Sequence, residues 1–94
     1  MLDRTHSDIG ERVIALVRAL LAKRSIDRPI GRDEDLAAAG LSSLDLVNLM
    51  LAIEAEFDLS IPEHDMLPAN FRSVARVEAL ITELTRVRAP IEAE

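Results

Sequence analysis

The chain has no cysteine, tryptophan or tyrosine, and only two phenylalanines and two histidines among its 94 residues. Without cysteine there can be no disulfide, thiolate nucleophile or cysteine-based zinc site, so any thiol chemistry must be brought in from outside. The scarcity of aromatics leaves aliphatic residues to build the core, which favours packed helices. We expect one domain, because two halves of this chain would each be too small to bury a core.

Long apolar runs are also lacking. No stretch approaches the roughly 18 apolar residues that a membrane-spanning helix needs. The start of the chain shows no basic segment followed by an apolar one, which would be typical of a secretory signal. We therefore expect a soluble, cytoplasmic protein that does not insert into membranes.

Basic residues are missing from the middle of the chain. Residues 33–66 carry nine Asp and Glu and no Arg or Lys, whereas residues 1–32 carry seven Arg and Lys against four acids. Nucleic-acid binding depends on cations that neutralise phosphates, so the acidic block argues against a nucleic-acid partner. The block would steer the protein towards basic patches on protein partners, although a charge run is more often only a solubilising surface.

The spacing of apolar residues predicts two helices in the first part of the chain. One amphipathic helix is expected over about 5–24, capped by Thr5 or Ser7, and a long connection follows with one short helical turn before Gly40. A second helix starts at Ser43. Its apolar residues form a broad stripe that we expect to be buried, comprising Leu44, Leu46, Val47, Met50, Leu51, Ile53, Ala55 and Phe57. The polar residues Asp45, Asn48, Glu54 and Glu56 are expected to form a wet, acidic side.

The last third predicts a linker and a final helix. Pro62 and Pro68 would begin and end a minor helix in this linker, and Ser73 would cap the final helix. Four residues of that helix should face inward, namely Val74, Val77, Ile81 and Leu84, with Leu80 and Val87 beside them. The expected fold is all-α, a small four-helix bundle of three main helices and one short helix. It forms a single domain, 1–94, with a core over about 5–88 and a frayed tail over 89–94.

No catalytic or metal-binding pattern stands out. His6 lies near the chain terminus and His64 lies in the linker, and nothing in their spacing encodes a Ser-His-Asp triad. The acids at 33–35 lack the alternating ligands and central glycine of a calcium loop, and there is no glycine-rich loop for phosphates. We expect neither a resident metal nor catalysis by the domain itself, although a small hydrolase remains an alternative.

Two adjacent serines precede the second helix. A serine just before an apolar-periodic run is a routine N-cap, and one cap needs only one serine. If Ser42 is the cap, Ser43 lies in the first turn with an exposed hydroxyl. The positive end of the helix would there favour an attached phosphate.

The sequence around these serines resembles the acyl and peptidyl carrier proteins, whose usual core is Gly-x-Asp-Ser-Leu followed by an acid. The matching stretch is Gly40-Leu41-Ser42-Ser43-Leu44-Asp45-Leu46-Val47. It is preceded by Asp35-Leu36 and followed by Glu54-Ala55-Glu56-Phe57 and Ile61-Pro62, so the resemblance covers nearly the whole chain. Two positions depart from the pattern, because Ser42 replaces the family's Asp and Asn48 replaces a common acid.

The resemblance implies that Ser43 carries 4'-phosphopantetheine, transferred from coenzyme A by a phosphopantetheinyl transferase. This arm would bring the thiol that the chain lacks and hold cargo as a thioester. Charging ligases and downstream transferases would supply the catalysis. The resemblance also implies that partners read a helix face made of Leu44, Asp45, Val47, Leu51 and Glu54. For Val47 and Leu51, ordinary core packing is an equal alternative.

The cargo is not encoded in the residues themselves. The chain looks like a freestanding, monomeric carrier, similar to the small aminoacyl carrier proteins, which are charged with an amino acid by ligases resembling truncated class II aminoacyl-tRNA synthetases. We therefore expect an amino acid as cargo. The alternatives are a fatty-acid or polyketide acyl carrier, or an unmodified helical adaptor that uses its acidic face for protein binding.

Overall fold

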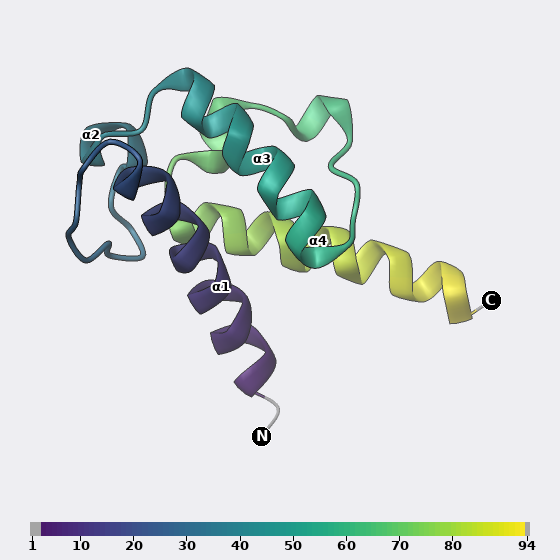
Figure 1. Cartoon of the computed structure of the whole chain (residues 1–94). Helices are drawn as coiled ribbons and strands as arrows, with labels where there is room; N and C mark the ends of the chain where they lie inside the picture. Colours follow the sequence, from purple (N-terminus) through teal and green to yellow (C-terminus); the bar gives the residue numbers. More distant parts are fainter. Residues whose placement is uncertain (1–2, 94) are drawn as a thin grey trace.

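In the computed structural model, residues 3–93 are described, with side chains over 9–86. This part of the chain contains four α-helices, two short 3-10 helices and no strand (Figure 1). The α-helices are α1 (Asp3–Ala22), α2 (Leu36–Ala39), α3 (Ser43–Phe57) and α4 (Val74–Ala93). The 3-10 helices are η1 (Glu63–Asp65) and η2 (Pro68–Phe71). The expected all-α fold of three main helices and one short helix is confirmed. None of the described helices is long and apolar enough to cross a bilayer.

The core lies where α1, α3 and α4 meet, with η2 closing one end. Phe71, from η2, is fully buried and is the largest side chain of the interior. The other buried hydrophobic residues are Val13, Val17, Leu20, Leu21, Ile30, Leu36, Leu41, Leu49, Met50, Ile53, Ile61, Val74, Val77 and Ile81. Aliphatic side chains thus form almost the whole core, as the composition predicts.

Figure 1 also shows where the ends of the chain lie. The first turn of α1 and the last turn of α4 both lie far from the start of α3. The linker after α3 returns to the beginning of that helix. Phe71 and Arg72 of the linker line one small hollow together with Leu46 of α3 and with α2. The start of α3 is therefore surrounded by α2, η2 and the turn after α1, and not by the chain ends.

The first helix differs at its start from the expectation. It begins at Asp3, so Thr5 and Ser7 lie inside the helix and the prediction that one of them is its cap is wrong. The helix ends at Ala22 in a turn where Ser25 has a φ of 62° and the Ile26 amide donates to the Leu21 carbonyl at 3.0 Å. A left-handed residue that reverses the chain in this way is a common helix ending.

The chain then reaches α3 through α2 and Gly40. Asp35 caps α2 by accepting hydrogen bonds from the Ala37 and Ala38 amides, at 2.9 and 3.2 Å. Gly40 ends it with a φ of 131°, a conformation that side chains other than glycine rarely adopt. A Cβ at Gly40 would also lie 2.6 Å from the Ile26 Cδ1 atom. The backbone conformation therefore requires glycine here, and a larger residue would also displace the Ile26 side chain from the turn after α1.

The linker contains two 3-10 turns where one minor helix was expected. Pro62 directly precedes η1, whereas Pro68 begins η2, so the prediction that Pro68 only ends the minor helix is wrong. Proline is suited to the first position of a helical turn, because its missing amide would be unpaired there anyway. The turn that Pro68 begins ends at Phe71, whose side chain is buried in the core.

The cap of α4 is confirmed, because the Arg76 amide donates to the Ser73 Oγ atom at 3.2 Å. Val74, Val77 and Ile81 are buried as expected. The backbone of the tail, 89–94, is helical up to Ala93. The side chain of Val87, expected beside the inward-facing residues, lies outside the described side chains.

Candidate functional site: the start of helix α3

The first turn of α3 is fixed by a reciprocal cap. Ser42 is the N-cap, and its Oγ accepts from the Asp45 amide at 3.2 Å. In return, the Asp45 Oδ2 accepts from the Ser42 amide at 2.9 Å and from the Ser42 hydroxyl at 3.1 Å. This capping box satisfies donors that a helix start otherwise leaves unpaired. The expectation that Ser42 caps the helix is confirmed.

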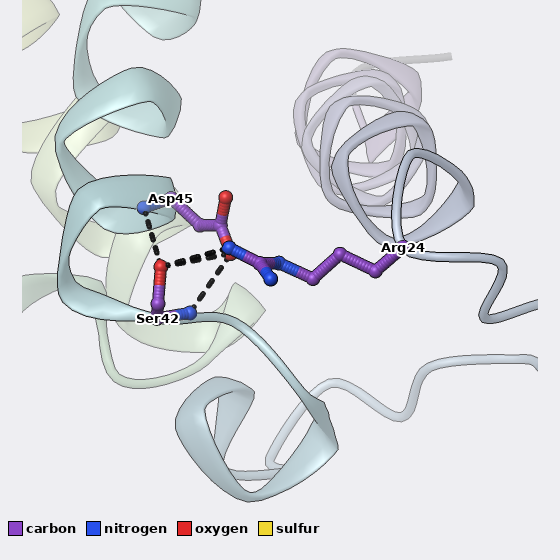
Figure 2. A network of polar contacts seen from close by, with 3 residues as sticks. All are labelled: Arg24, Ser42 and Asp45. Atoms are coloured by element: carbon purple, nitrogen blue, oxygen red, sulfur yellow. Dashed lines mark hydrogen bonds and ion pairs between the residues drawn. The ribbon is translucent and has the colours of Figure 1, made fainter.

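Arg24 joins this cap from the turn after α1, as Figure 2 shows. Its Nε donates to the Asp45 Oδ2 at 2.5 Å and its Nη2 donates to the Ser42 Oγ at 3.1 Å. The Asp45 side chain is only 11% exposed, while that of Arg24 is 45% exposed. Three residues from two distant segments therefore form one polar network at the start of α3.

The network sets the charge state of Asp45. The hydrogen bond from Arg24, followed by that from the Ser42 amide, lowers the pKa of Asp45 from 3.8 to about 2, against the opposing effect of burial. The same contact raises the pKa of Arg24. Asp45 is thus a carboxylate at neutral pH, and its charge is matched by an arginine within the fold.

Ser43 is the first residue of α3, directly after the cap. Its side chain is exposed, and its hydroxyl forms no hydrogen bond with the described residues. Because Ser42 fulfils the cap, the hydroxyl of Ser43 is not needed for the local structure. It lies at the positive end of the helix, where a bound phosphate is favoured.

The outward face of α3 is apolar. Leu44, Val47 and Leu51 are 67%, 47% and 55% exposed, and Ala55 is exposed as well. The prediction that these four residues belong to a buried stripe is wrong. Hydrophobic spacing alone cannot show which of two adjacent apolar faces is covered. Here α3 packs against α1 and η2, and Leu49, Met50 and Ile53 belong to the buried core.

The prediction that α3 has a solvent-exposed acidic side is wrong for Asp45, which is buried. Glu54 is half-buried and accepts from the Ile61 amide at 2.7 Å, so it anchors the linker. Glu56 pairs with Arg12 at 2.9 Å. Of the residues expected to form a recognition face, the structure brings Leu44, Val47 and Leu51 together on the surface and turns Asp45 and Glu54 towards contacts within the fold.

At least three of the nine acids in residues 33–66 form ion pairs with arginines. Arginines of residues 1–32 pair with acids of residues 33–66, namely Arg12 with Glu56, Arg24 with Asp45 and Arg28 with Glu34. Outside this block, Arg32 pairs with the buried Glu78 of α4. The sequence alone indicates only an acidic surface, because charges that pair over such separations leave no local pattern.

The histidines do not assemble a catalytic group. His64 is 82% exposed at the side chain and lies 3.6 Å from Asp65, and the side chain of His6 lies outside the described residues. Within the described part of the chain, no three His, Asp or Glu residues gather as a metal site would require. Arg24 is the functional candidate that the sequence analysis missed, since it lies in an irregular turn, far from Ser43 along the chain.

Comparisons with known proteins agree with this geometry. Residues 11–81 match the family described as "Phosphopantetheine attachment site". The chain is 38% identical over 76 residues to Aminoacyl carrier protein 1 of Bradyrhizobium diazoefficiens, covering 81% of this chain and 84% of that protein. It is 39% identical over 80 residues to Aminoacyl carrier protein 2 of the same organism, covering 85% and 90%.

Solved structures are also similar in both fold and sequence. One is the crystal structure of Bradyrhizobium japonicum glycine:[carrier protein] ligase complexed with glycylated carrier protein. The matching chain superposes with a TM-score of 0.65 at 39% identity, covering 77% of this chain and 97% of that chain.

Proposed function

Because the chain belongs to the phosphopantetheine attachment family, we propose that it carries an amino acid as a thioester on a 4'-phosphopantetheine arm attached to Ser43. Partner enzymes load this cargo and take it away, and the domain itself acts as a carrier and not as an enzyme. It works in the cytoplasm, together with the coenzyme A and the ligase that it needs. The observation that carries the proposal is the exposed hydroxyl of Ser43 beside a cap that Ser42 already completes.

The surroundings of Ser43 suit a phosphodiester. The hydroxyl is open to solvent, so a transferase can reach it. The helix start offers a positive potential, and the neighbouring carboxylate of Asp45 is neutralised by Arg24. The arm, once attached, supplies the thiol on which the cargo is held. The chain has no cysteine of its own that could compete for the cargo.

The relatives favour an amino acid as cargo over a fatty-acyl or polyketide group. Two of them are named aminoacyl carrier proteins, and the similar solved structure contains a glycylated carrier protein with its ligase. By analogy, this chain is loaded by a ligase that activates an amino acid and transfers it to the arm. Glycine is the first candidate to test.

The exposed residues Leu44, Val47 and Leu51 form the surface that partners contact. They lie on successive turns of α3, and Leu44 directly follows the attachment residue. Large exposed apolar side chains in one patch are typical of protein interaction sites. Asp45 and Glu54 support this surface from behind, through their contacts with Arg24 and with the Ile61 amide.

Intact mass measurement after incubation with coenzyme A and a broad-range phosphopantetheinyl transferase tests the attachment. We expect the protein to gain the mass of one phosphopantetheine and the Ser43→Ala variant to gain none. Ser60→Ala, which removes another exposed serine, should be modified like the original protein. If the original protein stays unmodified while a control carrier is converted, the carrier function is wrong. Modification of Ser43→Ala would move the site to another residue, with Ser42 the first to examine.

Loading of the modified protein tests the cargo. A glycine:[carrier protein] ligase with ATP and glycine should add one glycyl group, which hydroxylamine releases because it is held as a thioester. The unmodified Ser43→Ala protein is the control and should not be loaded. Loading by a fatty-acyl ligase, with none by amino acid ligases, would instead favour the acyl carrier alternative.

A further inference from the structure

The chain that enters α3 is held at two points by the turn after α1. Gly40 lies against the Ile26 and Leu21 side chains, so closely that a Cβ there would displace the Ile26 Cδ1 atom. Two and five residues later, Ser42 and Asp45 are bonded to Arg24. These contacts flank Ser43 on both sides.

A second arginine joins α1 to the opposite end of α3. The Arg12 Nε lies 2.9 Å from the Glu56 Oε2, its Nη2 donates to the Glu56 carbonyl at 2.8 Å, and its guanidinium lies 4.3 Å from the centroid of the Phe57 ring. Arg12, from within α1, and Arg24, from the turn after α1, thus each bind a carboxylate of α3. Only Arg24 contacts the residues next to Ser43.

We propose that Arg24 is a positioning residue for the attachment reaction, which it serves by fixing the first turn of α3 and with it the hydroxyl of Ser43. The inference rests on the proposed function. Ser42 and Asp45 could cap the helix without Arg24, because their reciprocal hydrogen bonds do not involve it. What Arg24 adds is a rigid connection between that cap and the body of the protein.

The attachment reaction demands such rigidity. The Oγ of Ser43 forms a bond to the phosphorus that carries the pantetheine, the bond from this phosphorus to the 3',5'-ADP oxygen breaks, and the hydroxyl proton passes to a base of the transferase. The attacking oxygen must lie in line with the bond that breaks. In such reactions a misplacement of about 1 Å can cost about a hundredfold in rate.

Steady-state kinetics of the transferase on Arg24→Gln, with Arg12→Gln as the matched control, tests the inference. We expect kcat for Arg24→Gln to fall about tenfold or more, with KM unchanged because the apolar surface of α3 is intact. Arg12→Gln should stay within about twofold of the original protein, since it loosens only the far end of α3. Circular dichroism at the assay temperature checks that both variants are folded.

Two further variants keep the test decisive if Arg24→Gln does not fold. Arg24→Lys retains a cation that can reach the Asp45 Oδ2, so it should recover most of the lost kcat. Asp45→Asn keeps the cap donors satisfied but weakens the link, so it should lower kcat without changing KM. The double variant Arg24→Lys with Asp45→Asn should be no slower than Asp45→Asn alone, because both residues act through one contact.

The outcomes separate the inference from the function on which it rests. If the original protein is not modified at Ser43, the proposed function fails. If it is modified, and Arg24→Gln reacts as fast as Arg12→Gln, the function stands and the positioning role of Arg24 is wrong. An equal loss of kcat in both arginine variants would show a general effect of stability and would also overturn the inference.

Discussion

The two long faces of α3 have almost the same composition and opposite environments. The inward face presents Leu49, Met50 and Ile53, which are buried, while the outward face presents Leu44, Val47 and Leu51, which are about half to two-thirds exposed. A helix with only a structural role would carry polar residues on its outer side. The difference indicates that the inner face serves folding, and it leaves the outer face available as the partner surface proposed above.

Truncating a leucine on each face gives the largest expected difference. Leu49→Ala removes a fully buried side chain and should lower the free energy of unfolding by about 2–5 kcal/mol. Leu51→Ala, at a position that is 55% exposed, should change it by less than about 0.5 kcal/mol. Urea unfolding followed by circular dichroism measures both. Equal losses would mean that Leu51 is covered in solution.

Placing a charge on the outer face should affect loading and leave folding intact. In Leu51→Asp, the carboxylate would have to be desolvated when a partner binds, so the loading efficiency of the ligase should fall about tenfold, equivalent to ~1.4 kcal/mol. Its thermal midpoint should remain near that of the original protein. Ala19→Asp adds the same charge at an exposed position of α1 and should be loaded normally. A loss in both variants would point to net charge, and not to the apolar surface.

Lowering the pH should destabilise the protein through the buried Asp45 at the start of α3, and not through the apolar outer face of that helix. Since the pKa of Asp45 is lowered to about 2 from 3.8, its contribution to stability is complete above about pH 4 and is lost as the pH falls towards 2. Asp45→Asn should remove this part of the acid destabilisation, whereas Leu51→Ala should retain it. Thermal midpoints recorded from pH 6 down to the acid range test the difference. Identical acid profiles for Asp45→Asn and the original protein would contradict it.

The smallest effect is expected at the far end of α3. Glu56→Gln breaks the ion pair with Arg12, but both side chains are more than a third exposed, at 39% and 37%. Such pairs contribute about 0.2–1 kcal/mol to stability. Urea unfolding at low and at raised salt should show this small loss, and raised salt should reduce it. A loss as large as that of Leu49→Ala would mean that the pair is shielded from solvent.

The sequence was sufficient for the fold class, for the cap at Ser42 and for most of the core. Local signals carry these features, since a cap needs only a serine before an apolar run and a helix needs only its period. The same signals assigned Leu44, Val47 and Leu51 to the core, because a period shows that a face is apolar and does not show what covers it. Only the resemblance to carrier proteins led to the prediction that partners bind this face.

The partners of the charged residues could not be predicted in the same way. Asp45 reads as an exposed acid in a helix, and its burial becomes evident only when Arg24 approaches from the turn after α1. That turn depends on Ser25 in a left-handed conformation, for which serine gives no distinctive signal. Interactions between distant segments are set by tertiary packing, and a single sequence does not reveal them.

The first turn of α1 and the last turn of α4 both lie far from the start of α3, and this has a practical consequence. A label can be joined ahead of α1 or after α4 without crowding Ser43, the residue proposed to bear the arm (Figure 1). Such a label could be a peptide tag, a fluorophore or a link to a solid support. The same geometry would allow the domain to be fused to a second protein at either end and still turn its cargo towards a free enzyme. The fold therefore allows a second protein or a label to be attached at two positions without covering the start of α3.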